Sequence, residues 1–190
     1  MLTSLPNLLT LSRIAAIPVL VILFFFDGAL MRWLAFLVYA FACITDFFDG
    51  YFARHWGQVS ALGRFLDPIA DKLLVAALIV LLVAFDHVTG FVVVPALVIL
   101  CREILVSGLR EYLAEIKVPM PVSRLAKWKT GIQMVALGIL IVGNAGPNGL
   151  PIQLIGEIGI WIAAGLTFVT GYDYLARGLK HMTAKAPAGR

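Results

Sequence analysis

Four aspartates lie close together in the first half of an apolar sequence, in two pairs: Asp46 with Asp49, and Asp67 with Asp71. The first pair is three residues apart and the second four, so each pair would share one face of an α-helix. Charged side chains between apolar runs are energetically costly and usually functional. Four carboxylates in a poorly solvated site repel one another unless cations neutralise them. Because oxygen ligands favour Mg²⁺ or Mn²⁺ over zinc, the pattern predicts a divalent-metal site.

The composition is that of an integral membrane protein. Hydrophobic residues make up 61% of the 190 residues and charged residues only 14%, against about 45–50% and about 25% in soluble domains. Each spanning helix needs about 20 apolar residues, so the length allows about six spans with short loops. The apolar runs are continuous and do not alternate with period two, which favours helices over a transmembrane β-barrel.

Glycines, prolines and charged residues divide the apolar sequence into six predicted spans. Their approximate ranges are 7–26, 30–53, 64–85, 91–113, 128–142 and 152–175. We find no repeat and no second domain, and we expect one membrane domain over 1–180 followed by a disordered polar tail over 181–190. The predicted fold class is therefore an all-α integral membrane bundle of six transmembrane helices.

Lysine and arginine predict the orientation, because basic residues concentrate on the cytoplasmic side of a membrane protein. Six spans place both termini on one side, together with the connections 54–64 and 111–127. All but one of the 15 basic residues fall on or near that side, and the exception is Arg32. Both termini and the aspartates should therefore face the cytoplasm. The net charge of +4 then reflects topology and attraction to anionic lipid rather than binding of nucleic acid.

Small residues accompany the aspartates. Gly50 and Ala53 lie near the face of the first pair, and Gly63 lies one turn before Asp67. Small side chains would let a phosphate-bearing ligand approach the backbone. They are also frequent where membrane helices pack together. The presence of four aspartates at fixed spacing among them favours the ligand.

From Asp46 to Asp71 the sequence reads D-x-x-D-G-x-x-A-R-x8-G-x-x-x-D-x-x-x-D. This pattern is the signature of the CDP-alcohol phosphatidyltransferases, and because every fixed position is present, the chain resembles that family. The segment from Pro6 to Arg13, P-N-x-L-T-x-x-R, is also similar to the family's bacterial amino-terminal segment. The resemblance extends over about residues 1–180.

The resemblance implies a homodimer of six-helix subunits in the bacterial cytoplasmic (inner) membrane, each with a polar cavity that opens to the cytoplasm. It implies that Asp46, Asp49 and Asp67 bind two divalent cations, with Asp71 as a further metal ligand or as the general base. It also implies the residues that bind the cytidine diphosphate part of CDP-diacylglycerol: Asn7, Thr10, Gly50, Ala53, Arg54 and Gly63. The chemistry agrees, since two metals can neutralise a diphosphate and a carboxylate can accept a proton from an attacking hydroxyl.

Four further cations are candidates for binding the second substrate. Arg102 and Arg110 are eight residues apart on one predicted helix, about 12 Å, and could bracket a small anion. Lys127 and Lys129 begin the next span on the same side. Both residue types commonly bind phosphate monoesters, although all four could instead extend towards lipid headgroups. The segments around them resemble the phosphatidylglycerophosphate synthase branch of the family, which implies sn-glycerol 3-phosphate as the acceptor.

The leading hypothesis is an enzyme that transfers the phosphatidyl group of CDP-diacylglycerol to sn-glycerol 3-phosphate and releases CMP. Inositol phosphate, serine and phosphatidylglycerol are alternative acceptors. A divalent-cation or proton-coupled transporter is an alternative of another class, because intramembrane carboxylates also mark ion paths. A transporter would need polar groups that continue to the opposite face, or inverted repeats. The outer halves of the predicted spans are nearly free of charge, and the intact acidic pattern also argues against a non-catalytic lipid-binding protein.

Overall fold

The computed structural model describes residues 5–56, 61–116, 118, 124–147 and 149–184. Within these ranges the side chains of 5–6, 47–56, 61–62, 64 and 180–184 are not described. The secondary structure of the described residues is entirely helical, which confirms the predicted all-α fold.

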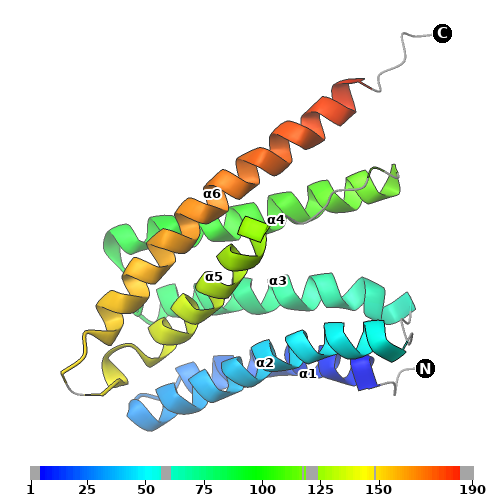
Figure 1. The fold of residues 1–190 in the computed structure, drawn as a ribbon. Helices are drawn as coiled ribbons and strands as arrows, with labels where there is room; N and C mark the ends of the chain where they lie inside the picture. Colours follow the sequence, from blue (N-terminus) through cyan, green and yellow to red (C-terminus); the bar gives the residue numbers. More distant parts are fainter. Residues whose placement is uncertain (1–4, 57–60, 117, 119–123, 148, 185–190) are drawn as a thin grey trace.

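Six α-helices follow one another along the chain: α1 (Leu5–Phe24), α2 (Ala29–Trp56), α3 (Ala61–Ala84), α4 (Val93–Glu115), α5 (Arg124–Val142) and α6 (Ile152–Ala184). Short 3₁₀ turns, η1 (Gly90–Val92) and η2 (Gly143–Ala145), precede α4 and follow α5. The helices run back and forth, so that the amino-terminal end of α1, the carboxyl-terminal end of α6 and the ends of α2 and α4 lie on the right of Figure 1. The last helix continues to Ala184, into the segment that we predicted as a polar tail.

Five helices are long and apolar enough to cross a membrane, over the ranges Asn7–Phe24, Ala29–Asp46, Gly90–Glu115, Leu125–Ala145 and Ile152–Leu179. Several such helices indicate a multi-pass membrane protein. The remaining helix, α3, carries four charged residues in its first half, Arg64, Asp67, Asp71 and Lys72. Its uncharged part, 73–84, is about 18 Å long at 1.5 Å per residue. This is shorter than the hydrocarbon core of a bilayer, about 30 Å.

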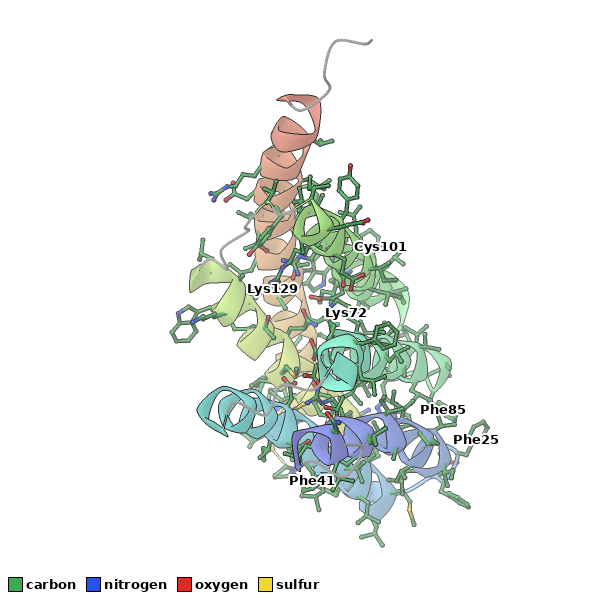
Figure 2. All side chains as sticks on the ribbon, turned by 90° about the vertical axis from the view of Figure 1, so that its right-hand side faces the viewer. Phe25, Phe41, Lys72, Phe85, Cys101 and Lys129 are labelled. Atoms are coloured by element: carbon green, nitrogen blue, oxygen red, sulfur yellow. The ribbon has the colours of Figure 1, made fainter. Side chains whose placement is uncertain are left out.

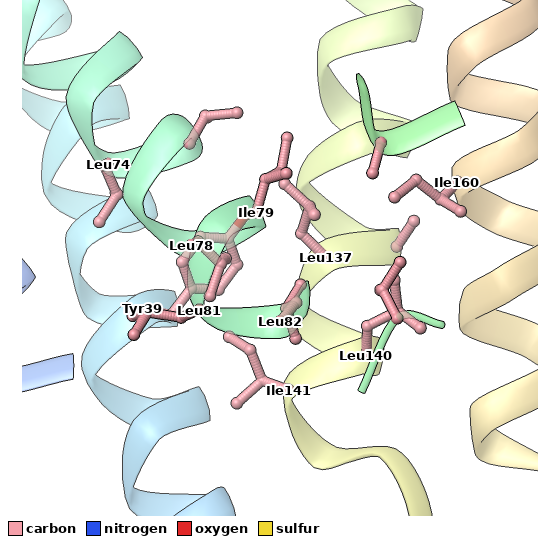
Figure 3. Close-up of a cluster of buried hydrophobic side chains, with 14 of the residues drawn as sticks. Tyr39, Leu74, Leu78, Ile79, Leu81, Leu82, Leu137, Leu140, Ile141 and Ile160 are labelled. Carbon is pink, nitrogen blue, oxygen red and sulfur yellow. The ribbon is translucent and has the colours of Figure 1, made fainter. Parts of the chain in front are cut away.

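A core of apolar side chains lies beyond the charged part of α3, towards the opposite end of the bundle. Leu74, Leu78 and Leu82 recur one turn apart on α3 and are fully buried. They belong to the same cluster as Leu137 and Leu140 of α5, as Figure 3 shows. Leu74 follows Asp71 by three residues. The apolar cluster therefore lies directly beyond the aspartates along α3 and separates them from the opposite end of the bundle.

Close packing fixes how α4, α5 and α6 lie against one another. A Cβ atom at Gly159 of α6 would lie 2.9 Å from Cβ of Ala136 on α5, and one at Gly156 would lie 2.8 Å from Leu140. The contacting residue on α5 moves from Ala136 to Leu140 as the residue on α6 moves back from Gly159 to Gly156. The two helices therefore run antiparallel. Small residues that allow such approach are typical of membrane helix contacts.

The outer loops are joined by polar contacts around His87, which lies between α3 and η1. Its Nδ1 donates to the carbonyl of Leu140 at 2.9 Å. Its own carbonyl accepts from Nε2 of Gln153 at 2.7 Å, and the same Gln153 amide is 2.9 Å from Glu157. Gly143, at φ +48°, ends α5 beside these groups, and a Cβ there would lie 3.0 Å from Oε1 of Gln153. These contacts hold the α3–α4 connection against α5 and α6.

Candidate active site

Helix α1 brings two buried polar side chains to the aspartates. Oγ1 of Thr10 donates to Oδ1 of Asp67 on α3 at 2.6 Å. Nη2 of Arg13 is 2.7 Å from Oδ1 of Asp46 on α2. The two α1 residues are three apart, so they share one face, and they are 0% and 1% exposed. One face of α1 therefore connects the carboxylates of the two neighbouring helices.

Asp71 lies one turn after Asp67 on the same face of α3. It is within electrostatic range of Asp46, of Arg13 and of Lys72, its neighbour in the sequence. Nζ of Lys72 itself donates to the carbonyl of Pro68 at 3.2 Å. The structure thus brings together three of the four predicted aspartates, and the side chain of Asp49 lies outside the described residues.

These carboxylates suit a hard divalent cation. All the candidate ligand atoms are oxygens, which hard divalent cations prefer. The three carboxylates lie near one another, and the buried Arg13 contacts one of them, Asp46. Among the side chains that the structure describes, no group of three His, Cys, Asp or Glu is close enough to hold a metal ion by itself. The donor chemistry fits the predicted metals, and Asp49, three residues after Asp46 on α2, would add a fourth carboxylate.

The residues predicted to bind cytidine diphosphate fall into two sets. Asn7, Thr10 and Gly63 are buried near the same ends of α1 and α3. Because Thr10 contacts Asp67 and the two helices run in the same direction, Asn7 lies near the level of Gly63, one turn closer to the helix ends. For Gly50, Ala53 and Arg54 the structure describes the backbone, which belongs to α2, but not the surroundings of the side chains.

A second charged group joins α4, α5 and α6. Nζ of Lys129 donates to Oε1 of Glu103, and Nη1 of Arg102 is 3.3 Å from the same oxygen. The guanidinium of Arg102 also lies over the ring of Tyr174, with Cζ 5.9 Å from the ring centroid. Lys129 is only 2% exposed. Two of the predicted phosphate-binding cations therefore pair with one carboxylate, with Lys129 buried and Arg102 partly buried.

The other two predicted cations lie apart from this pair. Arg110 is exposed two turns further along α4, and Lys127 is exposed at the edge of an apolar groove between α5 and α6. Residues two apart on a helix point about 200° apart, so Lys127 and Lys129 cannot share a face. The described side chains thus show an inner pair, Arg102 and Lys129, and two exposed cations, Arg110 and Lys127.

Asp71 connects the two groups. It is within electrostatic range of Glu103, and Lys129 is within range of Asp71. Figure 2, viewed from the right of Figure 1, shows oxygen and nitrogen atoms gathered between the helices near Lys72 and Lys129, whereas Phe25 and Phe41 lie on the outside. One carboxylate therefore lies between an acidic site suited to metal ions and a cationic site suited to a small anion.

Sequence reasoning missed the contact of Arg13 with Asp46 and the contact of Glu103 with Lys129. Arg13 was noted in the amino-terminal segment and among the basic residues of the cytoplasmic side, and it is the one charged residue within the first apolar run. An ionisable residue within a span is itself a signal of function or of a buried partner. Glu103 is next to Arg102 in the sequence, and its link to Lys129 depends on how α4 and α5 both pack against α6.

Comparison with known proteins agrees with this chemistry. The family model described as CDP-alcohol phosphatidyltransferase matches residues 3–169. A protein of Rickettsia bellii is 53% identical over 171 residues, which cover 90% of this chain and 93% of the relative. A protein of Cereibacter sphaeroides is 37% identical over 214 aligned positions, which cover 94% and 97%. One of Salmonella choleraesuis is 41% identical, with 92% and 96% covered. Each of the three is named CDP-diacylglycerol–glycerol-3-phosphate 3-phosphatidyltransferase.

Proposed function

The chain belongs to the CDP-alcohol phosphatidyltransferase family, and we propose that it transfers the phosphatidyl group of CDP-diacylglycerol to sn-glycerol 3-phosphate. The protein is a membrane enzyme of phospholipid synthesis, and its products are phosphatidylglycerophosphate and CMP. The observation that carries this assignment is the position of Asp71, which is within electrostatic range of Asp46 and also of Glu103 and Lys129. Glu103 and Lys129 pair with each other beside Arg102.

We propose that two divalent cations, Mg²⁺ or Mn²⁺, are held by Asp46, Asp49 and Asp67, with Asp71 as a further ligand. When bound, they neutralise the diphosphate of the donor and stabilise the departing CMP. Thr10 and Arg13 orient two of these carboxylates through the contacts at 2.6 and 2.7 Å. Groups that orient metal ligands in this way usually matter almost as much as the ligands themselves.

The cytidine diphosphate is proposed to lie along the ends of α1, α2 and α3. The residues assigned to it are Asn7, Thr10, Gly50, Ala53, Arg54 and Gly63. The burial of Asn7, Thr10 and Gly63 beside the aspartates supports this placement. The glycines allow the diphosphate to approach the backbone closely.

The acceptor phosphate is proposed to bind Arg102 and Lys129, with Arg110 and Lys127 as outer cations on its path from the cytoplasm. The free primary hydroxyl then lies towards Asp71, which accepts its proton. The hydroxyl oxygen forms a bond to the phosphorus that carries diacylglycerol. The bond from that phosphorus to the bridging oxygen breaks, and CMP leaves with the electron pair.

We further propose that α3 is the sixth span, and that the domain over 1–180 is a homodimer in the bacterial cytoplasmic membrane. Both termini and a polar cavity would face the cytoplasm, which the concentration of basic residues on that side supports. The charges of α3 at 64–72 would be shielded by the bundle and by the site, so its short apolar part would suffice.

The inner cation pair of Arg102 and Lys129 supports a phosphate-bearing acceptor over serine or phosphatidylglycerol as the preferred alcohol. Inositol phosphate is the alternative acceptor that the pair would also suit. The transporter hypothesis is less favoured, because the apolar cluster of Leu74, Leu78 and Leu82 follows the aspartates along α3 and would interrupt an ion path.

The test is CMP release by the purified protein in detergent with CDP-diacylglycerol, with and without sn-glycerol 3-phosphate. We expect release only when the acceptor and a divalent cation are both present. Release that continues without any acceptor would indicate hydrolysis, and no release under any condition would overturn the assignment.

A further inference from the structure

Three buried polar atoms around the acceptor site have no hydrogen-bond partner among the described residues. They are Nε of Arg102 on α4, Oε1 of Gln133 on α5 and Oγ1 of Thr167 on α6. Buried polar atoms normally have a partner, because leaving one unpaired costs free energy. Three such atoms from three neighbouring helices indicate a place where a polar ligand belongs.

Gln133 lies on the face of α5 that carries Lys129. The two residues are four apart, one helical turn, and both are 2% exposed. Gln133 therefore forms the next polar position towards the apolar core. No other charged or polar residue of the described α5 side chains is buried at this face.

Contacts of the next residue place Gln133 near the depth of Asp71. The hydroxyl of Tyr39 on α2 donates to the carbonyl of Met134 at 3.1 Å, and Sγ of Cys43 is 3.2 Å from Sδ of Met134. Tyr39 and Cys43 are both within electrostatic range of Asp71. Met134 thus lies opposite the part of α2 that faces Asp71, and Gln133 precedes it by one residue.

The packing of α6 brings Thr167 towards the same region. A Cβ at Gly171 would lie 3.0 Å from Cγ of Arg102, and one at Gly178 would lie 2.9 Å from Leu109. Thr167 is one turn before Gly171 on the same face of α6. Its neighbour Thr170 donates to the carbonyl of Leu166 at 2.8 Å, as helical threonines often do.

Glycerol 3-phosphate has three polar groups that a dry site must accommodate. Under the proposed function, the phosphate lies on Arg102 and Lys129, and the attacking primary hydroxyl lies at Asp71. The secondary hydroxyl on C2 lies between them along the molecule. That hydroxyl needs a hydrogen-bond acceptor if it is removed from water.

We propose that Oε1 of Gln133 accepts a hydrogen bond from the C2 hydroxyl and thereby selects a phosphorylated polyol as the acceptor alcohol. The inference rests on the proposed function and adds a specificity-determining residue to it. The side chain has an acceptor atom without a donor, it shares a face with the phosphate-binding Lys129, and it lies near the depth of the proposed base.

The decisive substrate is 3-hydroxypropyl phosphate, which keeps the phosphate and the primary hydroxyl and lacks only the C2 hydroxyl. A site built to pair with a hydroxyl discriminates strongly against an analogue without it. The wild-type enzyme should prefer glycerol 3-phosphate over this analogue by about 10- to 100-fold in kcat/KM. Gln133→Leu should lower kcat/KM for glycerol 3-phosphate by about that factor and change the value for the analogue by less than about threefold.

Gln153→Leu is the matched control, because Gln153 lies at the outer end with partners His87 and Glu157. It should leave the preference between the two acceptors unchanged. Gln133→Met offers a second apolar side chain of similar length if Gln133→Leu does not fold.

Three results would overturn the inference. They are equal turnover of both acceptors by the wild type, an unchanged preference in the Gln133 variants, and an equal loss for both acceptors in those variants. Release of CMP with neither acceptor by the wild type would instead overturn the proposed function, and the inference with it.

Discussion

Arg13 of α1 forms an ion pair with Asp46 of α2 in which the guanidinium is 1% exposed and the carboxylate 41% exposed, with Nη2 and Oδ1 2.7 Å apart. The arginine is therefore held inside the bundle while the aspartate still reaches the solvent-accessible site. This arrangement orients the carboxylate and also reduces the negative charge that an incoming diphosphate must approach.

Replacement of Arg13 should weaken binding of the anionic lipid donor. Arg13→Met leaves Asp46 without its partner and makes the site more negative. A hydrogen bond between charged groups contributes about 1.5–3 kcal/mol when buried, and the exposure of Asp46 reduces that figure. We expect the KM for CDP-diacylglycerol to rise about tenfold. Arg177→Met, which breaks the exposed pair with Asp173 at 3.1 Å, is the control and should change little. Equal kinetics in the two variants would contradict the role of Arg13.

Thr10→Val should lower the affinity for the divalent cation. Valine keeps the shape of threonine and removes the hydroxyl that donates to Asp67. Loss of a group that orients a metal ligand typically costs 10- to 100-fold, so about tenfold more Mg²⁺ or Mn²⁺ should be needed for half-maximal activity. Ser12→Ala is the control, because Ser12 donates to the carbonyl of Leu9 within its own helix. Identical metal titrations for both variants would show that Thr10 does not act through Asp67.

Asp71→Asn should abolish most turnover while CDP-diacylglycerol still binds. The amide keeps the shape of the carboxylate and cannot accept the proton of the attacking hydroxyl. Removal of a general base typically costs roughly 10²–10⁴-fold in rate. Binding of the donor and CMP release would be measured separately. Near-normal turnover would exclude the base role, and loss of metal binding in this variant would show that the role of Asp71 as a ligand predominates.

Lys129 and Lys127 should differ sharply in their effect on the acceptor. Lys129→Met removes a buried cation beside Arg102, so the KM for glycerol 3-phosphate should rise about 10- to 100-fold. Lys127→Met removes an exposed charge and should have a small effect. Because Lys129→Met also leaves Glu103 with Arg102 as its one remaining described ion-pair partner, the double variant with Glu103→Gln separates the loss of phosphate binding from loss of stability. Equal effects at 127 and 129 would contradict the assigned pair.

Acid should destabilise the outer end of the bundle through His87. Burial, reinforced by Arg32, lowers the pKa of His87 below its usual value of about 6.5, despite the opposing hydrogen bond to Leu140. The unfolded chain therefore takes up a proton at a higher pH than the folded chain does. The contribution of His87 to stability is present above about pH 6.5 and is lost as the pH falls from there towards the folded pKa. Thermal unfolding between about pH 5 and 8 should show a shallower pH dependence in His87→Gln, and the same slope in both proteins would contradict this.

The sequence predicted the helices well and their ends less well. The apolar runs located all six helices, because continuous hydrophobicity over a span is a strong signal. The last helix was predicted to end near 175 and continues to Ala184, since Arg177 and its neighbours can extend a helix beyond the membrane without any apolar signal. The charges of α3 shorten its apolar part, which is why α3 is not among the five helices of the described chain that are long and apolar enough to span a membrane.

The site was predictable where residue spacing alone determines it. The spacing of four residues predicted that Asp67 and Asp71 share one face of α3, whereas the position of Asp46 within range of Asp71 depends on how α2 and α3 pack against α1. The contact of Thr10 with Asp67 spans 57 positions and depends on how α1 packs against α3. The four cations were predicted as one group, and the described side chains show an inner pair and two outer residues. The helical angle between residues 127 and 129 predicts that these two side chains point in different directions. The link from Lys129 to Glu103 depends instead on how α4 and α5 both pack against α6.

The central claim is tested most directly by a competition among acceptors. Purified protein would be given CDP-diacylglycerol, Mg²⁺ or Mn²⁺, and equal concentrations of glycerol 3-phosphate, inositol phosphate, serine and phosphatidylglycerol, with the lipid products identified by mass spectrometry. We predict phosphatidylglycerophosphate as the main product, in a one-to-one ratio with CMP, and no product when the metal is chelated. A different main lipid, or undiminished product formation in excess chelator, would contradict the account.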